Sequence, residues 1–350
     1  MPYGVGLIGA GPGVASLHLP TLARLPELFR VVHVADAGSG RSAALAARTG
    51  ARSSSGIVEL LADPAVEVVA ICSPPEQHAA HILAAVDAGV RGILCEKPLA
   101  TGGADAEAAI AACRGARIPL IVGAHHAFDP AWGRATHHLF ASGERVRDIT
   151  VTLALPPNQR YHALVGEAPD GPPAEAAAGP PRLPDLSDPA IAATVVRRLV
   201  EGLAAHDLPL VRDLAPRFER MVFARALAPL GFALGFRASG IPVRMSALML
   251  PAGADALWRV EMTTDTDLVS VSFPPSFVHA GSAEVSVISG TDRASTYPRD
   301  ADDGYLAEWR ALADLLAGVA AAEYDAVLDD LHYIEAVATA AHDLILEGGR

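Results

Sequence analysis

A glycine-rich turn follows the first apolar run of the chain. The run Gly4–Ile8 predicts a buried strand, and Gly9-Ala10-Gly11 come directly after it, ahead of a helical stretch from about Val14 to Leu25. Glycines at such a place permit a tight turn and let a pyrophosphate lie against backbone N–H groups at a helix N-terminus. The pattern predicts a dinucleotide site that includes Gly9, Gly11, Gly13 and Val14.

Two details of this region bear on which dinucleotide fits. Val14 occupies the place of the third glycine of the usual GxGxxG pattern and Gly13 comes one residue early, so the turn is a variant that leaves room for an extra residue before the helix. Asp36 follows the next predicted strand, where a carboxylate can bind both ribose hydroxyls. A carboxylate repels a 2′-phosphate, which favours NAD, while the nearby Arg41 keeps NADP open. The alternative is a structural turn with Asp36 as a helix cap.

The elements around this turn alternate along the first part of the chain. Strands are predicted at Gly4–Ile8, Val31–Ala35, Val66–Cys72, Gly92–Cys95 and Leu120–Ala124, and helices at Val14–Leu25, Ser42–Arg48, Ile57–Ala62, His78–Ala88 and Asp105–Cys113. Such alternation predicts βαβ units and a parallel sheet with right-handed crossovers. Residues 1–125 are therefore expected to form a dinucleotide-binding Rossmann domain with a doubly wound parallel sheet.

The pattern changes after Asp129-Pro130. Helices are predicted at Ala131–Ser142, Ile191–Leu203, Phe223–Leu234, Tyr305–Val319 and Ala326–Leu346, and strands at Asp148–Leu155, Leu257–Thr263, Leu268–Phe273 and Ala283–Ser289. These strands alternate apolar and polar residues, as antiparallel sheets with one covered face do. The Pro-rich segment 166–189 predicts a long exposed loop. Residues 126–350 are thus expected to form an α/β substrate and oligomerisation domain with an open, mostly antiparallel sheet, whose last helix packs back toward the first domain.

Composition excludes several classes of function. Among 350 residues, 40 are acidic and 27 basic, so the net charge of −13 argues against a nucleic acid or an anionic membrane as partner. No apolar run approaches the ~20 residues of a membrane helix, and the N-terminus has no secretion signal. Three scattered cysteines form neither a disulfide framework nor a zinc signature, and the two adjacent histidines His125 and His126 match no metal motif. A cytoplasmic protein without a metal site is expected.

The tripeptide Glu96-Lys97-Pro98, which ends the fourth of these predicted strands, resembles the signature of the Gfo/Idh/MocA oxidoreductases, the glucose–fructose oxidoreductase and inositol dehydrogenase family. Four other segments are similar to family motifs in the same order: Cys72–His78, Val122-Gly123 with Phe128–Pro130, Leu153–His162 and Tyr324–Glu335. The resemblance spans nearly the whole chain and is strongest in the first ~130 residues. A tripeptide alone is weak evidence, whereas the ordered set is specific.

This resemblance implies an NAD(P)-dependent oxidoreductase that acts on a secondary alcohol or ketone of a sugar, cyclitol or related polyol. It also implies cofactor contacts from Ser73, Pro74, His78, Glu96 and Lys97, and a homo-oligomer, dimer or tetramer, built through the C-terminal sheet. A lysine at the carboxyl edge of a parallel sheet points into the crevice where ligands bind. Beside an oxidised nicotinamide its charged form is disfavoured, so Lys97 can exchange a proton near neutral pH.

The second catalytic group implied by the resemblance is His206, as an acid/base or a hydrogen-bonding partner of the reacting hydroxyl. The family places a carboxylate four residues before this histidine, but the chain has Gly202 there, and Pro209 replaces another family carboxylate. Glu201 and Asp207 are neighbours that could compensate. Among residues at substrate-contacting positions of the family, His126 and Tyr161 are the predicted substrate contacts, together with His206.

Two other functions stay open. A redox-neutral lyase or epimerase could use tightly bound NAD through a transient ketone. The missing carboxylates at Gly202 and Pro209 also leave room for a catalytically reduced, NAD-binding regulatory subunit. No GxSxG, HExxH or P-loop pattern supports a hydrolase or a phosphoryl-transfer enzyme.

Overall fold

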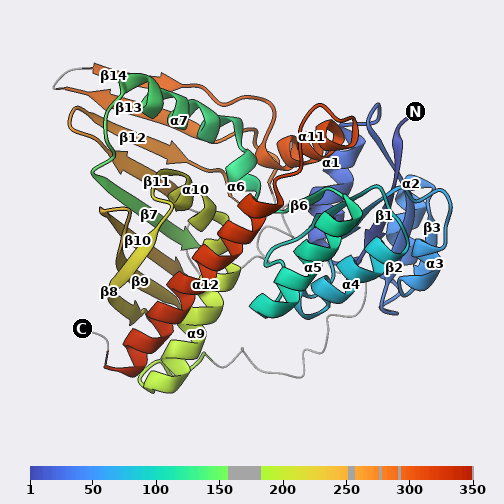
Figure 1. The fold of residues 1–350 in the computed structure, drawn as a ribbon, viewed down its shortest axis with the longest axis horizontal. Coiled ribbons are helices and arrows are strands. Elements are labelled where there is room, and N and C mark those ends of the chain that lie inside the picture. Colours follow the sequence, from blue (N-terminus) through green and yellow to red (C-terminus); the bar gives the residue numbers. More distant parts are fainter. Residues whose placement is uncertain (157–182, 251–256, 276–277, 291–292, 349–350) are drawn as a thin grey trace. The chain divides into compact units, whose positions relative to one another are not determined.

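The computed structural model describes residues 1–156, 183–250, 257–275, 278–290 and 293–348 (Figure 1). These residues form two compact units. Unit 1 contains Met1–His125 and Tyr305–Leu331, and unit 2 contains the described residues from His126 to Gly304 and from His332 onward. The expected loop at 166–189 lies mostly outside the described residues, and so does Tyr161. Among the described residues, no helix combines the length and hydrophobicity that crossing a lipid bilayer requires.

Unit 1 is a six-stranded parallel sheet in the order β3-β2-β1-β4-β5-β6. Its strands are β1 Tyr3–Ile8, β2 Phe29–Asp36, β3 Arg52–Ser55, β4 Val68–Ile71, β5 Gly92–Cys95 and β6 Leu120–Val122. Its helical elements are η1 Val14–His18, α1 Leu19–Ala23, α2 Arg41–Thr49, α3 Val58–Leu61, α4 Pro75–Asp87, α5 Gly103–Ala116 and α11 Gly304–Leu316. The predicted doubly wound Rossmann sheet is confirmed, and its carboxyl edge carries the glycine turn, Asp36 and Lys97.

The central strands of unit 1 are buried on both faces. All four residues of β4 and of β5 are inaccessible to solvent, as are Val5 and Leu7 of β1. Helices on each face explain this burial, because strands covered on both sides need apolar residues at every position rather than at alternate ones. The alternation of short apolar runs with helical stretches therefore carried enough information to predict the sheet.

Unit 2 is built on an eight-stranded sheet in the order β14-β13-β12-β11-β7-β10-β9-β8. Its strands are β7 Asp148–Leu155, β8 Phe218–Ala226, β9 Gly231–Ala238, β10 Ile241–Met249, β11 Leu257–Thr263, β12 Asp267–Ser272, β13 Glu284–Ser289 and β14 Arg293–Tyr297. Its helical elements are α6 His125–Phe128, α7 Pro130–Ser142, α9 Pro189–Gly202, η2 Ala204–His206, α10 Leu208–Leu214 and the later turns of α12 Tyr324–Leu346. Among the described strand pairs of this sheet, only β7 and β10 are parallel. The sheet is therefore mostly antiparallel, as predicted.

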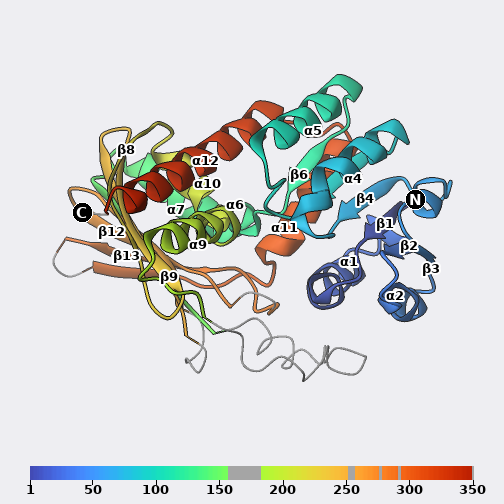
Figure 2. The same cartoon turned by 90° about the horizontal axis from the view of Figure 1, so that it is seen from below.

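Helices cover one face of the unit 2 sheet. Figure 2 shows α7, α9, α10 and α12 on the same side of the strands. In β12 the residues Val269 and Val271 are fully buried toward these helices, whereas Ser270 and Ser272 on the opposite face are partly exposed. The period-2 alternation in the sequence corresponds to this division between a packed face and a polar face.

The helix predicted at Phe223–Leu234 is wrong: the segment forms the hairpin of β8 and β9. Residues are apolar on both faces of β9, so no polar alternation reveals the strand, while Phe232, Leu234 and Phe236 are buried toward the core. Gly235 has no side chain because the Phe223 ring occupies that space; a Cβ there would lie 2.1 Å from Cε1 of the ring. Pairing with neighbouring strands therefore determined the conformation of this segment, although its composition is typical of a helix.

Candidate functional site

The turn after β1 requires glycine at its first position and is open at the following two glycines. Gly9 has a φ of +110°, and a Cβ there would lie 2.5 Å from the carbonyl oxygen of Cys72, so only glycine fits. At Gly11 and Gly13 an added Cβ would meet no heavy atom within 4 Å. The turn is thus packed against β4 on one side and open on the other, which leaves a cradle for a phosphate group at the start of the first helix.

The extra residue of the variant turn is accommodated within the helix rather than before it. Val14 begins η1, a π-helical turn that continues directly into α1. A π-turn takes one more residue per turn than an α-helix, and such turns are frequent at functional sites. The side chain of Val14 is buried, so any contact of Val14 with a cofactor would come from its backbone, and this contact stays a prediction.

Asp36 ends β2 and is half-buried. Its Oδ1 accepts a hydrogen bond from the backbone N–H of Ala37 at 2.8 Å, and its Oδ2 accepts one from the N–H of Ser39 at 3.0 Å and another from the Ser39 hydroxyl. The carboxylate therefore orders the turn that follows β2. A carboxylate has about four lone-pair sites, so this turn still leaves acceptor capacity for a diol.

Glu96 and Lys97 follow β5 at the carboxyl edge of the sheet, and both are half-buried. Oε1 of Glu96 lies 2.9 Å from Nε2 of His18, a residue that η1 contributes. Burial opposes ionisation of Glu96, but the hydrogen bond from His18 and the charges of His18, Lys97 and His125 outweigh it and lower the pKa of this carboxyl. Glu96 is thus an anion anchored to the helix of the glycine turn, next in sequence to Lys97.

His18 was not predicted as part of this site. It is 2% exposed, and Nε1 of Trp309 donates to its Nδ1 at 3.3 Å, which positions the ring from behind. The one sequence feature that could have indicated a role for His18 in this site is its spacing of seven residues from Gly11. A buried histidine in an apolar helix is more often a packed core residue. The thiol of Cys72 is close enough to interact with His18; burial raises the pKa of that thiol, so it is neutral.

The predicted contacts Ser73, Pro74 and His78 lie on the loop after β4 and on α4. His78 is 1% exposed; its Nε2 lies 2.7 Å from the carbonyl oxygen of Ser73 and its Nδ1 lies 2.8 Å from that of Pro98. This imidazole therefore links the loop after β4 to the segment that carries Lys97. Pro74 is exposed, and the Ser73 hydroxyl lies 2.9 Å from Nδ1 of His81.

The two adjacent histidines belong to different units. His125, the last residue of the first segment of unit 1, stacks on Tyr305 with ring centroids 4.2 Å apart. His126, the next residue, belongs to unit 2. It comes four residues after the end of β6, the strand whose Val122 pairs with Cys95 of β5. Chain connectivity alone thus ties His126 to the edge of the sheet that carries Lys97.

His126 lies in an aromatic cluster of unit 2. Its ring stacks on Phe273 with centroids 3.8 Å apart and meets Trp258 edge-on at 4.5 Å and His206 at 5.4 Å. Nδ1 of His126 lies 3.2 Å from Oδ1 of Asp207, and Nε1 of Trp258 donates to the same oxygen at 2.7 Å. The structure thus brings two predicted residues, His126 and His206, together around a carboxylate that is fully buried.

The pairing of carboxylates around His206 differs from a helical Asp–His arrangement. α9 ends at Gly202 and His206 ends the separate 3₁₀ turn η2, so the two positions are not on one α-helix. Glu201 is committed to Arg197, whose Nε donates to it at 2.8 Å. Of the two neighbours that could compensate, Asp207 enters the imidazole cluster, where it contacts His126 and Trp258. The sequence did not indicate a functional role for Trp258 or Phe273, because apolar residues in or next to strands usually pack in the core.

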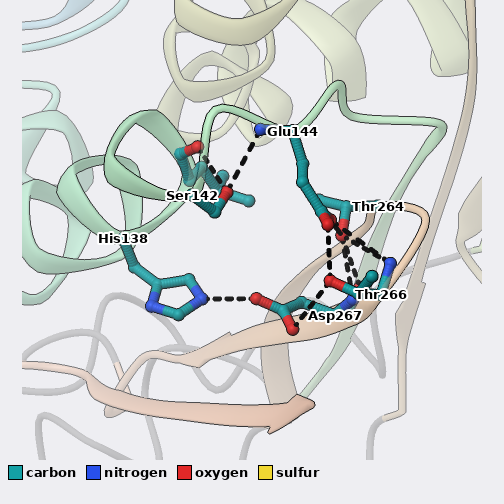
Figure 3. Close-up of polar contacts among 7 residues, drawn as sticks. His138, Ser142, Glu144, Thr264, Thr266 and Asp267 are labelled. Atoms are coloured by element: carbon teal, nitrogen blue, oxygen red, sulfur yellow. Dashed lines mark hydrogen bonds and ion pairs between the residues drawn. The ribbon is translucent and has the colours of Figure 1, made fainter. Parts of the chain in front are cut away.

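Other histidine–carboxylate pairs have structural surroundings. Figure 3 shows His138 on α7, whose Nε2 lies 2.6 Å from Oδ2 of Asp267 at the start of β12, beside Thr264, Thr266 and Glu144. This network ties the β11–β12 turn to α7. His138 is partly buried, whereas His137 is exposed.

In unit 1, His33 connects Asp63 and Ser54, each at 3.0 Å, in an arrangement that resembles a hydrolase triad. The Ser54 hydroxyl also donates to the carbonyl oxygen of Gly56 at 3.1 Å on an edge strand, so this chain of contacts holds strands together. No group of three or more metal-ligating side chains occurs within the part of the chain that the structure describes.

Comparison with known proteins agrees with this site. Residues 3–124 match the model of an oxidoreductase family with an NAD-binding Rossmann fold, Gfo/Idh/MocA. The match covers the first part of the chain, which is similar to this family. Inositol 2-dehydrogenase 1 of Saccharopolyspora erythraea is 37% identical over 136 residues, 38% of this chain and 40% of that protein. A 1,5-anhydro-D-fructose reductase of Ensifer adhaerens is 35% identical over 133 residues, 37% and 39% of the two chains. The matches thus span about two fifths of these relatives.

Solved structures resemble the whole chain in fold. UDP-N-acetylglucosamine 3-dehydrogenase of Acidithiobacillus ferrooxidans has a TM-score of 0.72 at 19% identity, with 99% of each chain covered. A 3-ketoreductase of Actinomadura kijaniata, solved with NADP and TDP-benzene, has a TM-score of 0.69 at 21% identity, with 97% of this chain and 98% of that one covered. At such identities the similarity concerns the fold. Residues 3–124 of unit 1 thus match an NAD-binding Rossmann family, and the solved neighbour of Actinomadura kijaniata was determined with NADP.

Proposed function

We propose that this protein is an NAD(P)-dependent oxidoreductase that interconverts a secondary alcohol and a ketone on a sugar, cyclitol or related polyol. The observation that carries the proposal is the open cradle at Gly11 and Gly13 on the same sheet edge as Lys97. The family match and the relatives named as inositol dehydrogenase and anhydrofructose reductase support the substrate class.

Residues of unit 1 would hold the cofactor. The backbone of the turn from Gly9 to Gly13 would accept the pyrophosphate, and Asp36 would bind the adenosine ribose. Because the Asp36 carboxylate repels a 2′-phosphate, we expect a preference for NAD over NADP. When bound, the nicotinamide supplies the acceptor or donor of the hydride at the substrate carbon.

Lys97 would move the proton of the reacting hydroxyl. The neighbouring Glu96 is ionised and hydrogen-bonded to His18, so it supplies a fixed negative charge beside the ammonium group. His206 would assist from unit 2, and His126 and Tyr161 would contact the substrate. Proton transfer by a positioned side chain typically contributes about 10²–10⁴-fold to the rate.

The polar face of the unit 2 sheet is the proposed interface of a cytoplasmic homo-oligomer. The face opposite the helices carries Ser270, Ser272, Glu284 and Ser286, which are partly or fully exposed. A broad polar surface of this kind suits a wet interface between copies. Light scattering at micromolar concentration should give a multiple of 36.2 kDa, and a monomer would contradict this part of the proposal.

Calorimetry and a substrate screen test the function. Titration with NADH and NADPH should show binding, with NADH tighter, and binding should be lost when Gly11 is replaced by Asp in the cradle. Absorbance of the reduced nicotinamide should then rise with NAD⁺ and one of a panel of cyclitols, sugars and sugar derivatives that starts with myo-inositol. Binding without any net absorbance change, but with conversion of a polyol, would favour a redox-neutral lyase or epimerase. Binding without conversion would favour a regulatory subunit.

A further inference from the structure

We propose that His18 is a positioning residue for Lys97: by holding the carboxylate of Glu96 in place, His18 sets how readily Lys97 releases its proton. This inference rests on the proposed function, because it assigns a control of the proton transfer that Lys97 would perform. All the residues that carry the inference belong to unit 1. It extends the site from the lysine to the helical turn that follows the glycines.

The composition of the chain singles out Lys97. It is the only lysine among 350 residues, and the other 26 of the 27 Lys and Arg residues are arginines. A guanidinium keeps its proton throughout the physiological pH range, whereas a lysine ammonium loses its proton more easily when it is partly buried. The one lysine stands just after β5, where the proposed reaction needs a proton to move. This composition indicates that arginine does not serve at this position.

Two contacts fix the imidazole of His18, which is 2% exposed. Nε1 of Trp309 donates to its Nδ1 at 3.3 Å, so in the neutral ring the hydrogen is on Nε2, which donates to Oε1 of Glu96 at 2.9 Å. Burial opposes a charge on the ring, but the interactions with Cys72 and Glu96 raise the pKa of His18 well above its ordinary value. Nε2 carries a hydrogen in the charged ring too. The donor to Glu96 is therefore present in both forms.

The carboxylate of Glu96 is held from a second side. A Cβ at Gly123, which follows β6, would lie 3.3 Å from Oε2 and 3.4 Å from Cδ of this side chain. The N–H of Glu96 donates to the carbonyl oxygen of Ile71 at 2.9 Å. The N–H of Gly123 donates to that of Cys95 at 2.8 Å. The carboxylate thus packs against a backbone that the sheet edge fixes, while His18 engages its other oxygen.

The position of this carboxylate bears directly on Lys97. Burial opposes ionisation of Glu96, but His18 and also the charge of Lys97 lower the pKa of the carboxyl, so the two neighbouring side chains interact. An opposite charge favours the charged form of a lysine, most of all when the two groups pair directly. His18 limits this effect because it engages Oε1 and, when charged, offsets part of the negative charge. Without His18 the carboxylate would be released toward the ammonium, and Lys97 would release its proton less readily.

Three other titratable groups belong to the surroundings of this pair. Cys72 follows β4, and burial raises the pKa of its thiol, so the thiol is neutral. His125 begins α6, and its charge contributes to the lowered pKa of Glu96. Glu308 of α11 is 1% exposed and acts on Cys72. These groups stay unchanged in the variants below, so differences between variants report on the pair itself.

The first measurement needs no substrate and follows the only lysine of the chain. In the full-length protein grown with ¹³C-labelled lysine, the ¹³Cε signal reports the titration of Lys97 alone. We expect the midpoint of this titration to move to higher pH by about half a unit or more in His18→Leu, and to lower pH in Glu96→Gln. His18→Gln, whose amide can donate in place of Nε2–H, should lie closer to the wild type. An unchanged or lowered midpoint in His18→Leu would overturn the proposal.

The double variant His18→Leu/Glu96→Gln separates positioning from packing. If His18 acts through the carboxylate, its removal should change the midpoint of Glu96→Gln far less than that of the wild type. The matched control is His33→Gln, which alters another buried imidazole of unit 1, 3.0 Å from Asp63, and should leave the midpoint of Lys97 unchanged. A full shift in the double variant, or an equal shift in His33→Gln, would reduce His18 to a packing residue and contradict the proposal.

A kinetic measurement connects this effect to the proposed function. On the polyol that the substrate screen yields, the pH at which alcohol oxidation reaches half its maximal rate should rise in His18→Leu together with the midpoint of Lys97. A pH profile that stayed in place would contradict the role of His18 in the reaction. If the protein binds NADH but converts no polyol, the proposed function fails, while the titration of Lys97 still decides whether His18 acts on it.

Discussion

Two histidine–aspartate pairs of unit 2 have similar contacts and different surroundings. His138 and Asp267 are 2.6 Å apart at the β11–β12 turn, and hydrogen bonds from Ser289 and His138 lower the pKa of the Asp267 carboxyl (Figure 3). His126 and Asp207 are 3.2 Å apart, at 1% and 0% exposure, among aromatic rings. The first pair joins a turn to a helix with many hydroxyl partners, whereas the second lies among the rings of Phe273, Trp258 and His206. Surroundings, rather than the pair itself, indicate which histidine has a chemical role.

The largest effect we expect comes from unit 1, and it tests whether the cluster of unit 2 can act alone. Lys97→Ala should lower the single-turnover rate by about 10²–10⁴-fold, since the hydroxyl proton loses its acceptor. His206→Ala should cost distinctly less, because Gly202 stands where the family places the carboxylate that would orient this imidazole. NADH affinity should change little in either variant. An equal or larger loss at His206 would show that the imidazole cluster carries the proton chemistry.

The second-largest expected effect distinguishes the His126–Asp207 pair from the His138–Asp267 pair. His126→Leu should raise KM about 10- to 100-fold through the lost hydrogen bond to substrate. His138→Leu should leave KM unchanged and lower the free energy of unfolding by about 1 kcal/mol, because Asp267 keeps its hydrogen bonds from Thr266 and Ser289. Steady-state kinetics and urea unfolding of both variants provide the comparison. A kinetic effect at His138 as large as that at His126 would remove the distinction.

A third buried carboxylate tests how strongly burial alone governs titration. Burial raises the pKa of Asp129 to about 6, although the N–H groups of Ala131 and Ala283 donate to it. The folded protein therefore holds this proton at pH values where the unfolded chain, with an ordinary value near 4, has released it. Stability should fall as pH rises through this window, by about 1 kcal/mol between pH 5 and 7.

The matched control for this titration is Asp129→Asn, which keeps the cap of α7 without a titrating group. Urea unfolding of both proteins at pH 5 and pH 7 isolates the contribution of Asp129. If the wild type lost no more stability than the variant over this range, hydrogen bonding to the carboxylate would outweigh its burial.

The sequence predicted the parts of this protein that depend on local pattern. The parallel sheet of unit 1 followed from apolar runs separated by helical stretches, and Lys97 from its place at a strand end. The π-turn at Val14 and the contact between His18 and Glu96 could not be predicted, since they depend on how a helix packs across the sheet edge. Asp207 reaches His126 across 81 residues of sequence, and no spacing rule relates positions so far apart.

The smallest expected effect concerns Gly202, where the family has a carboxylate. An added Cβ there would meet no heavy atom within 4 Å, so Gly202→Asp should fold. Because α9 ends at Gly202 and His206 lies in a separate 3₁₀ turn, the new carboxylate would not lie one helical turn from the imidazole. Asp207 already supplies a carboxylate to this cluster through its contact with His126. We therefore expect turnover and KM to change less than threefold in Gly202→Asp, measured beside the wild type on the same polyol. A large gain in rate would mean that the helix rewinds to bring Asp and His together, and that this chain retains the family arrangement in latent form.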